Sequence, residues 1–140
     1  MRIVCDTNVL VSGVLFGGFA RQILVLVSRG KLTNFISQDL LREVEAVLSR
    51  PKFQLSPAQV FVIIGVFRET FEHVSSPAQP VRVVESDPDD DRVLEAAQVA
   101  GAEVIVTGDK HLLSLGTWQG IRIMSPAELI ERLAEEDSKA

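Results

Sequence analysis

The sequence predicts a three-layer α/β/α domain built around a parallel sheet of four or five strands. Short apolar runs alternate with segments of helical spacing along the 140 residues, as expected for a parallel sheet with helical connections. Glycine and proline fall between these segments, and no internal repeat or low-complexity tract interrupts them. An apolar fraction of 46% with 6% aromatic residues suits one α/β domain with a real core.

The first half of the chain contains two expected strands and two expected helices. Residues 2–5 form an apolar run that predicts a buried strand, followed by a short helical stretch punctuated by glycines. Residues 19–29 carry apolar side chains close to a helical period. Residues 33–36 predict a second strand, and a helix over 38–49 follows, which Pro51 ends.

Two capping boxes mark helix starts in the second half of the chain. Ser56-Pro57-Ala58-Gln59 opens a helix expected to run to about Glu72, and Ser125-Pro126-Ala127-Glu128 opens a last helix to about Ala134. The segment from Ser75 to Pro80 is expected to be a loop. The other expected elements are strands at 81–84, 103–106 and 121–124 and a helix over 89–100.

We expect a single domain over residues 1–134, followed by an acidic C-terminal tail at 135–140. The single cysteine, Cys5, lies within the first strand, which indicates a small buried residue in a reducing compartment. The longest apolar run, residues 60–67, is too short to cross a membrane. Because Asp6 interrupts the first apolar stretch, no secretory leader is expected, and we predict a cytoplasmic protein.

Acidic residues follow two of the expected strands directly. Asp6 ends the first apolar run, and Asp109 follows the strand at 103–106 through Thr107 and Gly108. In an open parallel sheet the carboxyl ends of the strands face one crevice, where ligands bind. Carboxylates gathered there repel one another unless they hold a divalent cation, so this pattern predicts metal-dependent chemistry on phosphates. The alternative is that each Asp caps the helix that follows it.

A run of aspartates opens one of the expected helices and offers a third candidate ligand. Asp90 lies three and four residues before Val93 and Leu94, so it heads the apolar stripe and is predicted to point over the sheet. Asp91 heads a row with Glu95 that is predicted to face solvent, and it is the reserve candidate. The alternative is an acidic helix start favoured by the helix dipole.

Glu43 and Glu45 are candidates on the helix over 38–49. They lie on opposite borders of its apolar stripe, so helical spacing does not choose between them, and either could be a solvated flank. Asn8 and Thr107 are polar residues beside the candidate aspartates. They are candidates for hydrogen bonds to the ligands or to a phosphate.

A formal net charge of −5 argues at first against a nucleic-acid partner. Bound cations weaken that argument, because one divalent ion changes the formal charge to −3 and two change it to −1. An acidic nuclease that meets the phosphate through its cations is therefore physically reasonable.

Taken together, the motifs resemble those of the PIN domain family, in the branch of toxins from toxin–antitoxin pairs. The resemblance extends over nearly the whole chain, and the order and spacing of the motifs carry it. The matching segments are residues 6–12, Ser37 and Glu43, residues 47–53, residues 87–91 with Leu94 and Ala97, and residues 106–110.

The resemblance implies a PIN-like fold and a ribonuclease that hydrolyses RNA phosphodiester bonds with one or two Mg²⁺ or Mn²⁺ ions. By position in the motifs, it implies Asp6, Glu43, Asp90 and Asp109 as the catalytic and metal-binding carboxylates. It thus favours Glu43 over Glu45. It also implies a homodimer or higher homo-oligomer and an antitoxin partner that holds the enzyme inactive.

Two other functional classes remain as alternatives. One is a PIN-like module without catalysis that binds RNA or protein. The other is a switch resembling a phospho-receiver domain, which needs an acceptor Asp at the end of a middle strand. The expected middle strands end at Ser37 and near Glu85-Ser86, without such an Asp, which disfavours the switch.

Overall fold

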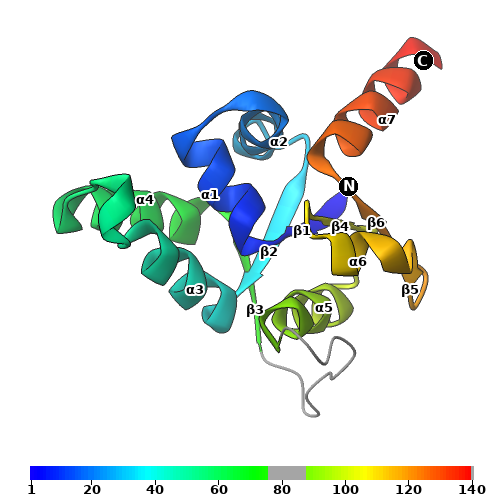
Figure 1. The fold of residues 1–140 in the computed structure, drawn as a ribbon. Helices are drawn as coiled ribbons and strands as arrows, with labels where there is room; N and C mark the ends of the chain where they lie inside the picture. The colour runs from blue at the N-terminus through cyan, green and yellow to red at the C-terminus, as the bar shows by residue number, and fades with distance from the viewer. Residues whose placement is uncertain (76–87, 140) are drawn as a thin grey trace.

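The protein is described by a computed structural model that covers residues 1–75 and 88–139, with side chains from Met1 to Ser75 and from Asp91 to Ser138 (Figure 1). Helices and short strands alternate along the chain. The strands are β1 (Arg2–Cys5), β2 (Thr33–Ser37), β3 (Glu72–Val74), β4 (Val104–Val106), β5 (Thr117–Trp118) and β6 (Ile121–Met124). The helices are α1 (Thr7–Leu15), α2 (Gly18–Ser28), α3 (Gln38–Leu48), the short 3₁₀ helix η1 (Pro51–Phe53), α4 (Pro57–Thr70), α5 (Pro88–Ala100), α6 (Lys110–Leu115) and α7 (Pro126–Lys139).

The strands form one sheet in the order β3-β2-β1-β4-β6-β5. All neighbouring pairs are parallel except β5 and β6, which are antiparallel. From β1 the chain continues to β2 on one side, whereas β4 lies on the other side and pairs Val106 with Cys5. The carboxyl ends of β1 and β4 therefore flank a topological switch point, the usual ligand position in such sheets.

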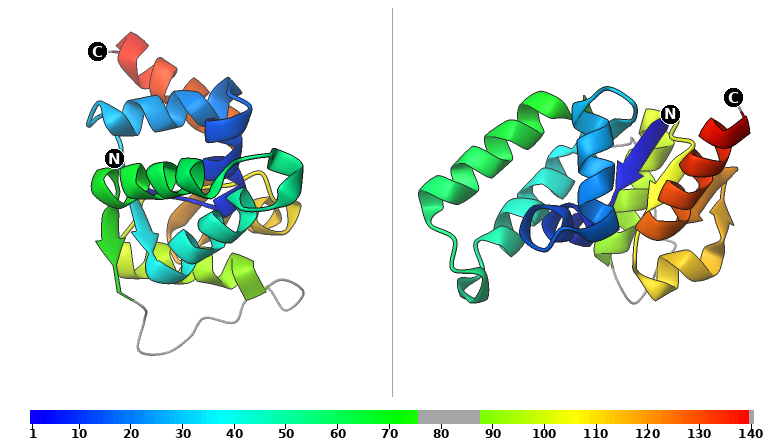
Figure 2. Two further views of the ribbon diagram at one scale, coloured as in Figure 1. Left: turned by 90° about the vertical axis from the view of Figure 1, so that its left-hand side faces the viewer. Right: turned by 90° about the horizontal axis from the view of Figure 1, so that it is seen from above.

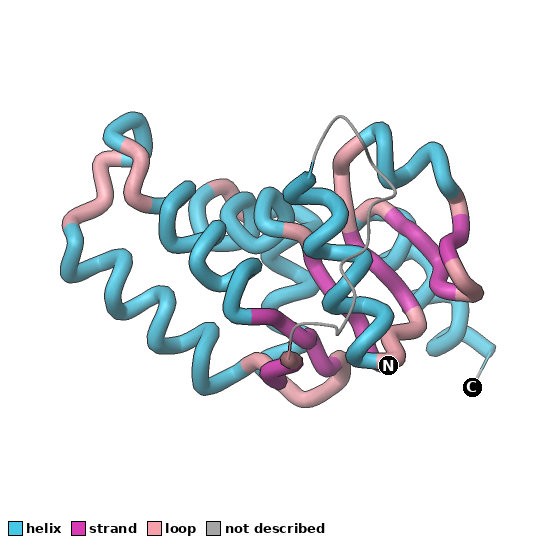
Figure 3. The backbone as a smooth tube through the Cα atoms, turned by 90° about the horizontal axis from the view of Figure 1, so that it is seen from below, coloured by secondary structure: helices cyan, strands magenta, loops and turns pink. Residues whose placement is uncertain are grey.

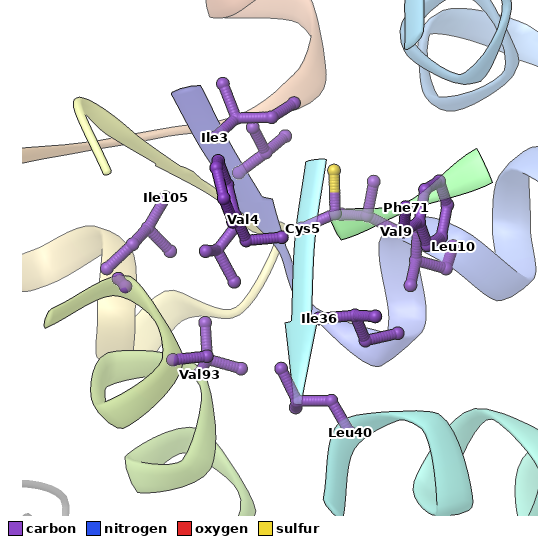
Figure 4. Close-up of a cluster of buried hydrophobic side chains, with 14 of the residues drawn as sticks. Ile3, Val4, Cys5, Val9, Leu10, Ile36, Leu40, Phe71, Val93 and Ile105 are labelled. Atoms are coloured by element: carbon purple, nitrogen blue, oxygen red, sulfur yellow. The ribbon is translucent and has the colours of Figure 1, made fainter. Parts of the chain in front are cut away.

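Helices cover the sheet on both faces, which confirms the predicted α/β/α fold. Figure 4 shows Val93 of α5 pointing toward β1 from one side and Val9 and Leu10 of α1 from the other. All three side chains are buried, as are Val4 and its neighbours in the sheet. Figure 3 shows the central strands lying between helices.

The sheet has six strands, where the sequence predicted four or five. The strands at 2–5, 33–36, 103–106 and 121–124 are confirmed within one residue at each end. The strand predicted at 81–84 lies outside the described residues. The additional strands β3 and β5 contain three and two residues, too few to produce a periodic pattern in the sequence.

Two helix ends differ from the prediction. The helix expected to reach Glu72 ends at Thr70, because Phe71 is extended (φ −92°, ψ 149°) and stacks its ring on Phe67 with the centroids 4.7 Å apart. The chain then pairs with β2 as strand β3. The last helix, expected to end near Ala134, continues to Lys139, so most of the predicted acidic tail is helical.

The longest apolar run of the sequence lies within α4. In the described ranges, no single helix is long and apolar enough to cross a membrane. Helices α1 and α2 reach that length and composition only as a pair, bent by 95° at the break between them.

Candidate metal centre

Asp6 is held at the end of the central strand β1. Its backbone N–H donates to the carbonyl of Val106 at 3.0 Å, which continues the pairing of β1 with β4. Its carboxylate Oδ1 accepts from the Val9 N–H at 2.9 Å and caps α1, while Oδ2 accepts from the Thr107 hydroxyl. The side chain is 5% exposed. Asp6 is therefore a buried carboxylate fixed in orientation by both of its neighbours.

Asp109 lies beside Asp6 and is fixed in the same way. Its carboxylate Oδ1 accepts from the backbone N–H groups of His111 at 2.8 Å and Leu112 at 3.2 Å, and so caps α6. The backbone N–H of Asp109 donates to Thr107 Oγ1 at 3.0 Å. Thr107 thus connects the two aspartates through hydrogen bonds.

Both aspartates are helix caps, as the alternative interpretation proposed. The caps explain why the chain tolerates an acidic residue at each strand end. They do not explain why the buried carboxylate of Asp6 lies close enough to the half-buried Asp109 to feel its charge. The helix-cap hydrogen bonds engage Oδ1 of each residue, which is compatible with a cation bound on the other side of each carboxylate.

The environment of Asp6 disfavours its negative charge. Burial raises the pKa of the Asp6 carboxyl from its usual 3.8, and hydrogen bonds from Thr107 and from the Val9 and Asn8 backbones oppose that rise. The nearby charge of Asp109 raises the pKa further. A divalent cation between the two carboxylates would remove both costs, so this part of the site fits a cation.

Replacing Asp6 by Asn is expected to stabilise the fold at neutral pH without divalent cations, by about 1 kcal/mol. Because folding raises the pKa of Asp6, its contribution to stability is complete at acid pH and is lost as pH rises through the folded-state value. An asparagine does not titrate and still caps α1. Urea unfolding in EDTA should show a gain over wild type that grows as pH rises above 3.8, the usual pKa of this carboxyl. A gain in unfolding free energy that does not change with pH would contradict the raised pKa of Asp6.

The structure corrects the predicted orientation of Asp91. Asp91 and Glu95 were predicted to face solvent, but they are 4% and 5% exposed, and Glu95 pairs with Arg92 at 3.2 Å. The reason is that α5 packs against four strands and α3, so protein covers more than its apolar stripe. The side chain of Asp90 lies outside the described part of the chain. Asp91 is thus a buried acidic residue near the start of α5.

Glu43 and Glu45 differ in burial. Glu43 is half-buried on α3, the helix that packs against α1, α4 and α5, whereas Glu45 is exposed. The burial favours Glu43, in the direction that the family resemblance implies. Asn8 is exposed in the first turn of α1, where its backbone N–H faces the Asp6 carboxylate.

Sequence reasoning missed Asn34, a buried amide on β2. Its Oδ1 accepts from the Cys5 N–H at 2.9 Å, directly before Asp6. Asn34 therefore fixes the end of β1 from the side opposite to Thr107. A polar residue inside the apolar run at 33–36 was the available signal. Cys5 itself is buried, and burial raises the pKa of its thiol, which excludes a reactive thiolate there.

The structure brings together Asp6, Thr107 and Asp109 from the two central strands. Among the side chains that the structure describes, no three His, Cys, Asp or Glu residues form a group that could hold a metal ion. Two carboxylates supply oxygen ligands of the kind that Mg²⁺ and Mn²⁺ prefer. The donor chemistry of these two residues fits such a cation.

Comparison with known proteins agrees with this arrangement. A family model described as PIN domain matches residues 2–111. The chain belongs to the PIN domain family. PIN domains are generally nucleases, and the matched residues of this PIN domain include Asp6, Glu43, Asp90 and Asp109. No curated protein matches the chain.

Two solved structures share the PIN fold. One is the structure of VapBC2 from Rickettsia felis bound to a DNA fragment from the VapBC2 promoter. It aligns with a TM-score of 0.62 and 15% sequence identity, and the alignment covers 88% of this chain and 97% of that chain. PAE2754 from Pyrobaculum aerophilum aligns with a TM-score of 0.59 and 19% identity over 96% of this chain and 90% of that chain. At these identities the likeness establishes the fold.

The premise used against a phospho-receiver switch needs correction. The sequence placed the middle strands before Ser37 and near Glu85-Ser86, but the central strands of the sheet are β1 and β4. Asp6 therefore does follow a central strand. It is buried and caps α1, and the chain matches the PIN family, so the switch is not supported.

Proposed function

We propose that this PIN domain is a metal-dependent endoribonuclease that hydrolyses RNA phosphodiester bonds and acts as the toxin of a toxin–antitoxin pair. The observation that supports it most is the pairing of Asp6 and Asp109 at the switch point between β1 and β4. A buried carboxylate whose pKa is raised by burial and by the charge of a half-buried neighbour is suited to a divalent cation.

In this proposal Asp6, Glu43, Asp90 and Asp109 hold one or two Mg²⁺ or Mn²⁺ ions, with Asp91 as the reserve ligand. A cation held by these carboxylates would supply a lowered pKa for a bound water and would offset negative charge on the phosphate and the leaving oxygen. Asp6 and Asp109 supply fixed carboxylate oxygens, since helix caps and the Thr107 hydroxyl hold them.

The other residues at this edge position the substrate and the ligands. Thr107 keeps the Asp6 carboxylate and the Asp109 backbone in one geometry. In this proposal Asn8, which is exposed in the first turn of α1, donates to a phosphate. No side-chain nucleophile is required, because water attacks phosphorus in line with the leaving oxygen.

The proposal includes partners and a location. Similarity to VapBC2, a toxin–antitoxin complex, supports an antitoxin protein as the inhibitor of this chain. RNA is the proposed substrate, a homodimer or higher homo-oligomer the proposed assembly, and the cytoplasm the proposed location.

Cleavage of single-stranded RNA is expected to depend entirely on a divalent cation. EDTA should abolish cleavage, and added Mg²⁺ or Mn²⁺ should restore it, because the carboxylates cannot activate water alone. Calorimetric titration with Mn²⁺ should show binding, and Asp6→Asn should weaken it by at least about tenfold.

The combination of measurements separates the alternatives. RNA binding without cleavage at any cation concentration would favour the inactive PIN-like module. Cleavage that continues in EDTA would contradict the proposed metal centre.

A further inference from the structure

Phe16 ends helix α1 with an aromatic ring that is open to solvent. It is the C-cap residue of α1, and it is 73% exposed. Directly after it the chain bends by 95° into α2, through Gly17 and Gly18, whose φ angles of 87° and 65° favour glycine. Figure 2 shows this bend between the two helices. A single exposed apolar residue needs no explanation, so the surroundings of Phe16 decide whether it marks a site.

A second aromatic ring and two cations lie beside Phe16. The ring of Phe53 meets the ring of Phe16 edge-on, with the centroids 6.3 Å apart, and Lys52 Nζ lies 5.1 Å from the Phe53 centroid. The Arg21 guanidinium donates to the backbone carbonyls of residues 13 and 14, both at 2.9 Å, which holds its charge at the end of α1. Phe16, Arg21, Lys52 and Phe53 together form an aromatic platform, contributed by the end of α1, by α2 and by η1.

The turn that carries Lys52 and Phe53 is fixed by its own backbone. The Phe53 N–H donates to the carbonyl of Arg50 at 3.1 Å, and the N–H of residue 54 donates to that of residue 51 at 3.0 Å. Residue 54 is a glutamine with a φ of 53°, in the left-handed region that residues other than glycine rarely adopt. Such backbone conformations cluster at sites that clamp ligands. A preformed platform also loses less conformational entropy when it binds.

Helix α1 connects the platform to the metal centre. Asp6 caps its first turn and Phe16 its last, so about 14 Å of helix separates the two. Within α1, all of which the structure describes, Asn8 alone is exposed. Asn8, Ser12 and Phe16 are spaced four residues apart and lie along one row of the helix surface, and Ser12 is partly exposed. Solvent therefore reaches this row of α1 between Asp6 and the platform.

We propose that the aromatic platform binds single-stranded RNA, with an unpaired base stacked on the Phe16 ring and phosphates next to Lys52 and Arg21. The inference rests on RNA as the substrate in the proposed function, and it adds a nucleotide-binding site separate from the metal centre. Aromatic rings beside cations bind bases of any sequence through their faces. A chain with a net charge of −5 needs such local groups of cations to attract RNA.

Two other occupants fit the platform less well. In a duplex the bases stack on one another, so their faces are not available to Phe16. A protein partner would cover the ring with a largely apolar surface, whereas Arg21 and Lys52 carry charges that phosphates neutralise.

Fluorescence anisotropy of a labelled single-stranded RNA, in EDTA and at low salt, tests this inference. EDTA removes the cation that the proposed cleavage requires, so the RNA stays intact. The wild type is expected to bind the single strand more tightly than a duplex of the same length. Phe16→Ala should raise the dissociation constant by about tenfold, the scale of one stacked base, whereas Phe16→Trp should keep the affinity. The tryptophan emission of Phe16→Trp should fall when RNA is added, because the base stacks on the indole.

Lys52→Gln should reduce the slope of log affinity against log salt concentration by about 0.7, the value for one phosphate contact on a single strand. Lys31→Gln is its matched control, since Lys31 is exposed beyond the end of α2 that lies opposite Phe16. Phe61→Ala is the control for the loss of an exposed ring, because Phe61 is 79% exposed on α4. Both controls should bind within about twofold of the wild type, and circular dichroism should confirm that each variant is folded.

The outcomes separate this inference from the nuclease proposal. A wild type that does not bind single-stranded RNA, or an affinity that Phe16→Ala leaves unchanged, would overturn the inference even if the chain cleaves RNA with Mg²⁺. An equal loss of affinity in Phe61→Ala would also overturn it. Binding that depends on Phe16, without cleavage once Mg²⁺ is restored, would support the platform and contradict the nuclease proposal.

Discussion

Asp6→Asn is expected to reduce metal-dependent RNA cleavage by about 10²- to 10³-fold, the scale of removing a preorganised electrostatic group from an active site. The amide has nearly the shape of the carboxylate but no charge to hold a cation. Its oxygen can still accept from the Val9 N–H, and its NH₂ group can donate to Thr107 Oγ1 once the hydroxyl rotates. The fold should therefore persist while cleavage is lost.

Single-turnover cleavage of a labelled RNA at saturating Mg²⁺ measures the effect, and the unfolding experiment on the same variant shows that it is folded. Asp137→Asn is the matched control, because Asp137 is exposed near the end of α7. Its cleavage rate should stay within about twofold of the wild type, as for most surface changes. Full activity in Asp6→Asn would remove Asp6 from the metal centre, and with it the observation on which the proposed function depends.

The sequence predicts the longer strands and fails for the shortest ones, which depend on pairing. Residues 2–5 and 121–124 are recognisable because mostly apolar runs end at polar residues or turns. Strand β3 exists because Phe71 stacks on Phe67 and leads the chain along the edge of β2. That contact is a tertiary one, and the three residues of β3 are too few to show the alternation of apolar and polar side chains that marks a strand.

The candidate site, like the strands, is predicted from the sequence only in the part that does not depend on tertiary contacts. That Asp6 and Asp109 each follow a strand is visible in the sequence, but 101 residues separate Asp6 from Thr107. Their hydrogen bond requires β1 and β4 to be neighbours, which only the strand order decides.

Helical spacing correctly grouped Asp91 with Glu95 but assigned their row to solvent. Spacing shows which residues share a row and not how many sides of a helix the protein covers. Because α5 is enclosed by the sheet and by α3, acidic residues outside its apolar stripe are buried as well.

Glu43→Gln is expected to lower the cleavage rate by about 10²- to 10³-fold, whereas Glu45→Gln should leave it within about twofold of the wild type. The two residues share α3 and differ in burial, since Glu43 is half-buried and Glu45 is exposed. We propose the half-buried Glu43, and not Glu45, as the residue whose carboxylate holds the cation. Glutamine preserves the size and the helix propensity of either residue.

The comparison decides between two positions that helical spacing leaves equivalent. Both variants are measured at saturating Mg²⁺ and again over a Mn²⁺ titration, because a lost ligand raises the cation concentration needed for half-maximal cleavage. Loss of activity in Glu45→Gln with full activity in Glu43→Gln would place the ligand on the opposite border of α3. Full activity in both would mean that α3 contributes no ligand, and that the carboxylates of α5 complete the site around Asp6 and Asp109.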